Sequence, residues 1–293
     1  MIDGRKAVLA GAADGHIHLF DAVDGSPVRP PFHAHNGYVS GIAVLDDDEQ
    51  PKIASISVSE KAVQIWNLGS KGINAAREFA PAGGFTIERI PFEKDPSNLI
   101  FEGPYHQIKM LSLSTETLTT LPWMQVGSHI YCFRFGVLDG EHMIASAGAD
   151  DPITVWSLKR ATMQCKPMRA GTMTAGLAFA QWHGQNVLLS GGFDGRVSVW
   201  NLKDGSPLIK PFTAHSAGIN AIISGTMFNE TVGISAGGDS TLAIWRLGGE
   251  ILRTIYLGGW ILSIKALDSD RIAAGTADGV VAIKIPGLAL LST

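Results

Sequence analysis

The chain has 293 residues, of which 45% are hydrophobic and 17% are charged, and its formal net charge is −4. This composition excludes an intrinsically disordered chain. The absence of any Lys/Arg cluster argues against electrostatic binding of nucleic acid. No apolar run approaches the roughly 20 residues that cross a bilayer, so no membrane association is expected. The N-terminus does not resemble a signal peptide, and the two cysteines, Cys132 and Cys165, are expected to be free thiols in the cytoplasm.

A unit of about 45 residues recurs along the chain. Each copy has a short apolar segment, a Ser- or Gly-rich end, a turn residue and an alternating segment that often ends in Trp. In chain order the turn residues are Asp14, Glu60, Tyr105, Asp150, Asp194, Asp239 and Asp278. Their spacings are 46, 45, 45, 44, 45 and 39 residues. This regularity predicts seven equivalent structural units.

Within each copy the hydrophobic residues alternate with a period of two, which is typical of half-buried antiparallel strands joined by tight turns. The sixth copy predicts four strands, at Ile219–Met227, Val232–Ala236, Thr241–Leu247 and Ile251–Leu257. One such sheet cannot bury both of its faces, whereas a ring of sheets can. The sequence therefore predicts an all-β, seven-bladed β-propeller of four-stranded antiparallel blades, with residues 1–293 forming one domain.

The repeats resemble the WD-repeat (WD40) family of β-propellers across essentially the whole chain. The family's Trp-Asp end appears as Phe20-Asp21, Trp66-Asn67, Trp156-Ser157, Trp200-Asn201 and Trp245-Arg246, and its Gly-His start as Ala34-His35 and Ala214-His215. The turns of Asp24–Val28 and Asp204–Leu208, both containing Gly-Ser-Pro, resemble those of bacterial members, especially from actinobacteria.

The resemblance implies a hydrogen-bonded tetrad made of a loop His, a strand Ser or Thr, the turn Asp and the Trp indole. Only one copy has all four in order: His215, Ser235, Asp239 and Trp245. We expect these residues to be structural, because a buried carboxylate must be paired and an indole N–H needs an acceptor. The third copy departs from the pattern, since it has Tyr105 at the turn and Leu111 in place of Trp.

Both ends of the chain stop inside a copy. Too few residues precede Asp14 for a full set of strands, so the first blade is expected to lack its innermost strand. At the other end, Leu288–Thr293 leaves room for at most a short fourth strand. An uncovered sheet edge is normally avoided. Three interpretations stay open: the chain belongs to a longer protein, a partner adds a strand, or a three-stranded blade is tolerated.

Residues typical of catalysis are scarce. The sequence has no nucleophile elbow, phosphate-binding loop or Cys-x-x-Cys pair. His16 and His18 share one strand face, as do His33 and His35, but no third metal ligand is identifiable beside either pair. We therefore expect no catalytic residues, no metal and no cofactor.

Exposed loops on a rigid ring suggest a binding platform. According to their positions in the repeat, several aromatic side chains lie on the face that carries the turns and the loops between copies. Exposed aromatic side chains are typical anchors of protein interfaces. The expected partner-binding residues are Tyr38, Phe85, His129, Phe193, Trp260 and, in the degenerate turn, Tyr105. The alternative is that these rings merely cover the blade edges.

The function that these features favour is a non-enzymatic scaffold or sensor that presents this face to a protein partner. A more specific version is a regulatory or inhibitory domain of an effector enzyme. The other class is a propeller hydrolase or lyase with its site at the channel mouth, where Glu88, Arg89 and Arg134 are the few polar residues among apolar ones.

Overall fold

The computed structural model describes residues 2, 4–45, 51–60, 62–69, 73–79, 86–90, 98–125, 127–150 and 152–290. It divides into two compact units, Met1–Tyr131 and Cys132–Thr293, each described here by itself. The regular elements of the described residues are strands, apart from one short 3-10 turn, η1 (Pro104–His106). Within these residues we find no helix long and apolar enough to cross a membrane.

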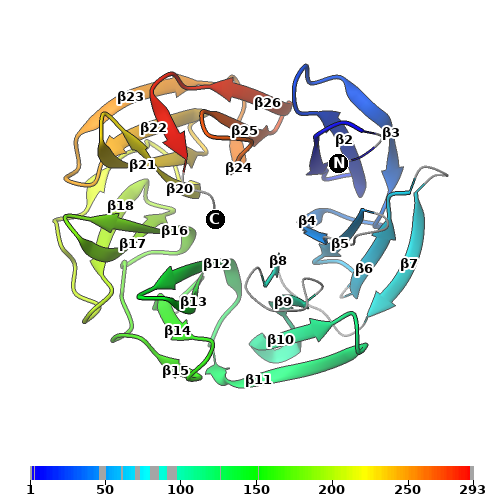
Figure 1. Cartoon of the computed structure of the whole chain (residues 1–293), viewed down its shortest axis with the longest axis horizontal. Coiled ribbons are helices and arrows are strands. Elements are labelled where there is room, and N and C mark those ends of the chain that lie inside the picture. The colour runs from blue at the N-terminus through cyan, green and yellow to red at the C-terminus, as the bar shows by residue number, and fades with distance from the viewer. Residues whose placement is uncertain are drawn as a thin grey trace. The chain divides into compact units, whose positions relative to one another are not determined.

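The first unit contains three antiparallel sheets in chain order (Figure 1). The first sheet is β1 (Ala7–Gly11), β2 (His16–Asp21) and β3 (Pro27–His33). The second is β4 (Val39–Leu45), β5 (Lys52–Ser57), β6 (Ala62–Asn67) and β7 (Asn74–Phe79). The third is β8 (Ile87–Arg89), β9 (Asn98–Glu102), β10 (Gln107–Ser112) and β11 (Thr117–Gln125). Neighbouring strands within each sheet follow one another along the chain, as successive hairpins require.

The second unit contains four sheets, the first of which starts with β12 at the end of the first unit. This fourth sheet is β12 (Ile130–Leu138), β13 (Glu141–Gly148), β14 (Thr154–Ser157) and β15 (Thr162–Met163). The fifth is β16 (Thr174–Trp182), β17 (Gln185–Gly192), β18 (Arg196–Asn201) and β19 (Phe212–Thr213). The sixth contains β20 (Ile219–Met227), β21 (Glu230–Gly237), β22 (Thr241–Arg246) and β23 (Ile251–Tyr256). The seventh is β24 (Ile261–Ala266), β25 (Arg271–Thr276) and β26 (Gly279–Lys284).

The cores lie between successive sheets of each unit. In the first unit, Ile17 and Leu19 of the first sheet pack with Ile53 of the second. In the second unit, Ile234 and Ile244 of the sixth sheet pack with Ile264 of the seventh. In the sixth sheet the middle strand β21 is buried on both faces, because the fifth and the seventh sheets cover them. This double burial explains the low charge of the sequence.

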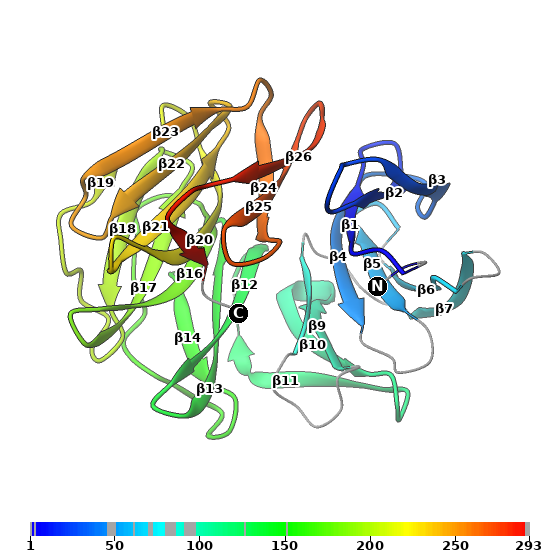
Figure 2. The ribbon, with the colours of Figure 1, turned by 45° about the horizontal axis from the view of Figure 1, so that its top comes forward.

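The last strand, β27 (Leu288–Leu290), joins the sixth sheet rather than the seventh. It pairs antiparallel with β20, where Thr226 lies opposite Ala289, and becomes a fifth strand (Figure 2). The sequence predicted a short strand here, but assigned it to the last blade. The packing of Leu288 explains the difference. Its side chain is buried in the core of the sixth and seventh sheets, so residues that are distant in the sequence fix the position of the strand.

The predicted fold class is confirmed: the chain is all-β and has the seven small antiparallel sheets of a seven-bladed β-propeller. Among the described residues the first sheet has three strands, as expected for a blade without its innermost strand. The seventh sheet also has three, and the remaining sheets have four or five.

Candidate interaction face and its hydrogen-bonded support

One end of the sheets in the second unit is defined by a repeated backbone hydrogen bond. In three sheets the turn between the second and third strands donates an N–H to the loop that leads into the first strand. The pairs are Phe193 to Met173 (2.9 Å), Gly238 to Gly218 (2.8 Å) and Ala277 to Trp260 (2.9 Å). These turns and loops therefore lie together at one end of each sheet, which we call the loop end.

Two predicted partner-binding residues lie at the loop end of the second unit. Trp260 is 66% exposed and Phe193 is 38% exposed. Phe193 lies against Gly218, because a Cβ on that glycine would be 2.8 Å from the Phe193 ring. Trp260 therefore presents most of its indole to solvent, whereas Phe193 also covers the neighbouring sheet.

The other predicted residues belong to the first unit. Tyr38 is 44% exposed in the loop before β4, and Tyr105 is 91% exposed in η1. His129 contacts the buried carboxylate of Glu102, at 3.1 Å, so it is not a free aromatic anchor. Phe85 lies outside the described residues. The structure thus groups His129 with the degenerate turn around Tyr105.

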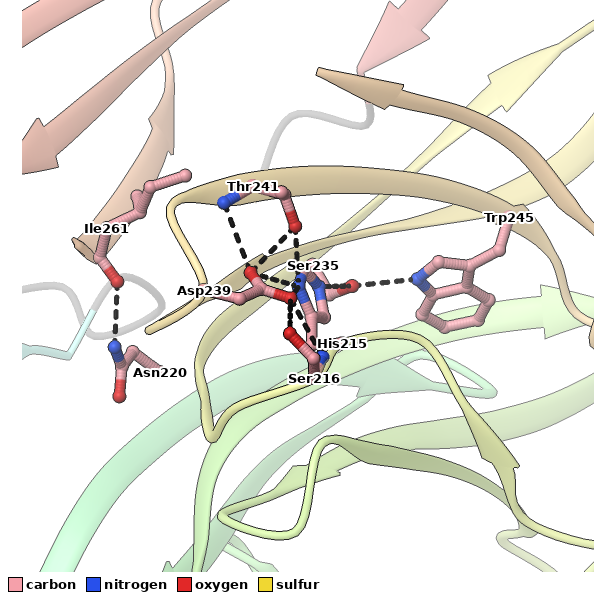
Figure 3. Close-up of polar contacts among 8 residues, drawn as sticks. All are labelled: His215, Ser216, Asn220, Ser235, Asp239, Thr241, Trp245 and Ile261. Carbon is pink, nitrogen blue, oxygen red and sulfur yellow. Dashed lines mark hydrogen bonds and ion pairs between the residues drawn. The ribbon is translucent and has the colours of Figure 1, made fainter. Parts of the chain in front are cut away.

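The predicted tetrad forms in the sixth sheet (Figure 3). Trp245 Nε1 donates to Ser235 Oγ at 3.0 Å, and Ser235 Oγ lies 2.7 Å from His215 Nε2. On the other side of the ring, His215 Nδ1 lies 3.0 Å from Asp239 Oδ1. Asp239 also accepts hydrogen bonds from the Ser216 N–H and from Thr241.

A neutral His215 satisfies every member of this chain of hydrogen bonds. With the proton on Nδ1, the imidazole donates to Asp239 and accepts the Ser235 hydroxyl proton at Nε2. The Ser235 oxygen then accepts the Trp245 N–H. Because Ser235 and Trp245 are completely buried, loss of any member would leave a polar group without a partner. These hydrogen bonds connect the loop before β20 with the turn before β22 and with two strands of the sheet.

A second tetrad forms in the second sheet, with Glu60 in place of Asp. Trp66 Nε1 donates to Ser55 Oγ at 2.8 Å, which lies 2.8 Å from His35 Nε2. His35 Nδ1 lies 2.5 Å from Glu60 Oε2, and the Asn36 N–H donates to Oε1. The sequence contains the signal, because Glu60 occupies the turn position and His35 the loop position, but the family motif has Asp at the turn.

The backbone of each tetrad histidine is hydrogen-bonded to a turn glycine of the preceding sheet. The His215 N–H donates to Gly195 O at 3.1 Å, and the His35 N–H donates to Gly15 O at 3.1 Å. Both glycines have positive φ, +76° and +86°, and a Cβ there would overlap the carbonyl oxygen of the same histidine. The tetrads therefore link successive sheets as well as strands within one sheet.

The tetrad carboxylates give the protein a dependence on acid pH. Burial alone would raise the pKa of Asp239, but hydrogen bonds from Thr241, His215 and the Ser216 N–H outweigh it, so the pKa lies below its ordinary value. Burial would also raise the pKa of Glu60, but hydrogen bonds from Asn36 and His35 outweigh it, so this pKa too lies below its ordinary value. A lowered folded-state pKa adds stability above the unfolded-state pKa, near 4, and this stability is lost as pH falls through the folded-state value.

We therefore expect the urea midpoint of the wild type to fall steeply as pH drops below about 4.5. An Asp239→Asn, Glu60→Gln double variant should be less stable at pH 7, by about 1–3 kcal/mol for each site, and should lose less on acidification. Urea titrations from pH 7 to pH 3 measure both effects. If the urea midpoints of the two proteins fell equally with pH, these carboxylates would not be the cause of the pH dependence of stability.

The likeness of this chain to known proteins lies in its fold. No family model matches the chain, and no curated protein sequence matches it. Among solved structures, 1429 chains match, so the fold is widespread. One of them is the structure of U3-55K, with a TM-score of 0.75 and 17% sequence identity, covering 96% of this chain and 92% of that chain. At this identity the likeness shows the fold alone, which is a WD40-like, seven-bladed β-propeller.

Proposed function

We propose that this chain is a non-enzymatic protein-interaction module of the WD-repeat family that binds its partner at the loop end. The observation that supports it best is the exposure of Trp260. A large indole, 66% exposed, stands in a loop whose backbone is fixed by the hydrogen bond from Ala277. Rigid exposed aromatics have little conformational entropy to lose on binding and are enriched among binding hot spots.

The tetrad of His215 supports the same proposal, because it fixes a loop of the loop end. His215 is held by Asp239 of its own sheet and by Gly195 of the preceding one. A rigid surface binds with less ordering cost than a mobile one. We further propose that the protein is cytoplasmic and bacterial, does not bind nucleic acid or membranes, and acts within a larger complex, as a regulatory domain of an effector enzyme would.

The edge of β1 supports a further element of the proposal. Among the described residues β1 pairs with β2 on one side and with no strand on the other. Its unpaired backbone groups suit strand addition by a partner or by another segment.

Trp260→Ala is expected to weaken binding of the co-purified partner by more than about 1 kcal/mol, or at least about fivefold in Kd, while leaving the melting temperature nearly unchanged. The matched control is Phe228→Ala. Phe228 is also exposed, at 73%, but lies in the hairpin between β20 and β21, at the other end of the sheet. Titration calorimetry with the purified partner measures both. Equal losses for the two variants, or a large loss of stability in Trp260→Ala, would contradict the proposal.

A further inference from the structure

The third sheet, which lacks the tetrad, carries a buried carboxylate faced by two imidazoles. Glu102 ends β9, and its side chain has no exposed surface. Its Oε2 accepts the Ile130 N–H at 3.0 Å. Its Oε1 lies 2.7 Å from His106 Nδ1 and 3.1 Å from His129 Nδ1. All four residues belong to the first unit.

Full burial of a carboxylate requires compensation of its charge. Within the described part of the chain, the ion-pair partners of Glu102 are the two histidines, and no lysine or arginine pairs with it. Among the residues that the structure describes, the groups within hydrogen-bond distance of this buried carboxyl are therefore two imidazole nitrogens and one backbone N–H.

Two consecutive residues beside this cluster have a strained backbone conformation. Tyr105 and His106 are consecutive non-glycine residues in the left-handed region, both with φ of +58°. Such residues each cost about 1–3 kcal/mol and persist where the surroundings over-determine them, often at functional sites. In the same segment, the His106 ring meets the His129 ring edge to face, with centroids 4.5 Å apart.

We propose that Glu102, His106 and His129 bind a divalent transition-metal ion, with Zn²⁺ as the preferred ion. One carboxylate and two imidazoles form a donor set typical of zinc, and three protein ligands leave a fourth position for water. The three donor atoms lie within 4.8 Å of one another. Tetrahedral zinc with bonds of about 2.0–2.1 Å needs its ligand atoms about 3.3 Å apart. The separations from Oε1, 2.7 Å to His106 Nδ1 and 3.1 Å to His129 Nδ1, are shorter by about 0.6 and 0.2 Å, so an outward movement, mainly of His106, makes room for the ion.

The surroundings provide both orientation and access for the ion. The Ile130 N–H fixes Oε2 and so turns Oε1 toward the imidazoles, which is the role of an outer-sphere hydrogen bond in a metal site. The side chains of His106 and His129 are 32% and 53% exposed, which leaves an entry path from solvent. The site lies in the first unit, whereas Trp260 belongs to the second.

The test is a Zn²⁺ titration of the full chain, first freed of metal, in competition with a chromophoric chelator. We expect one high-affinity site per chain, and visible d–d bands of tetrahedral Co²⁺ when that ion replaces zinc. Glu102→Gln, which can still accept the Ile130 N–H, and His106→Ala should each weaken binding at least about 100-fold. The control is His33→Ala, because His33 and His16 form the other histidine pair of the first unit, with ring centroids 5.3 Å apart.

Three results would overturn the proposal. The first is the absence of a saturable site in the wild-type chain. The second is unchanged affinity in both Glu102→Gln and His106→Ala, and the third is loss of binding in His33→Ala. If either site variant fails to fold, the Co²⁺ spectrum of the wild type decides, since tetrahedral bands support the site and a purely octahedral spectrum refutes it.

Discussion

Replacing Trp245 by Ala is expected to lower the free energy of unfolding by about 3–5 kcal/mol. The indole is completely buried and lies flat against Gly233, its cross-strand neighbour, where a Cβ would be 2.1 Å from Trp245 Cη2. Because the glycine leaves that space to the indole, truncation creates a cavity that local side chains cannot fill. It also removes the N–H that Ser235 accepts.

Trp260→Ala is the matched control for this prediction, because Trp260 belongs to the same unit but is mostly exposed. It should change the free energy of unfolding by less than about 0.5 kcal/mol. Urea unfolding of both variants, with the slopes compared to exclude a change in the denatured state, measures the difference. Similar losses for the two tryptophans would contradict the structural role of the tetrad.

The second large effect is expected for Gly195→Ala, which should cost about 3 kcal/mol or more. Gly195 has φ of +76°, and a Cβ would lie 2.2 Å from the carbonyl oxygen of His215. The substitution adds backbone strain and also pushes away the loop that carries the tetrad histidine. The loss should therefore appear as a lower denaturation midpoint.

Gly184→Ala separates the two contributions. Gly184 lies in the same sheet with nearly the same φ, +73°, but a Cβ there meets nothing within 4 Å. Only the conformational cost remains, about 1 kcal/mol. If Gly195→Ala costs no more than Gly184→Ala, the contact with the His215 loop does not stabilise the fold.

The fold was predictable from the sequence because its signals are local. Alternating hydrophobicity and tight turns placed the four strands of the sixth sheet within about two residues of those observed. The pairing of β27 with β20 was not predictable in this way. It depends on the burial of Leu288 in a core whose other residues are distant in the sequence.

The candidate sites were only partly predictable. The tetrad of His215 follows from a motif, whereas that of His35 was missed because Glu60 replaces Asp and reaches the imidazole with its longer side chain. The cluster around Glu102 was missed for a different reason. His106 and His129 lie 4 and 27 positions after Glu102, and the contact with His129 depends on tertiary structure that no local pattern encodes.

The proposal of a binding face at the loop end is tested most directly by hydrogen–deuterium exchange of the chain with and without its co-purified partner. We predict that binding protects the amides of the loops around Phe193 and Trp260 and leaves the hairpin of Phe228 unchanged. Protection confined to that hairpin and to its counterpart at Trp182–Gln185 would place the partner at the opposite end of the sheets and contradict the proposal.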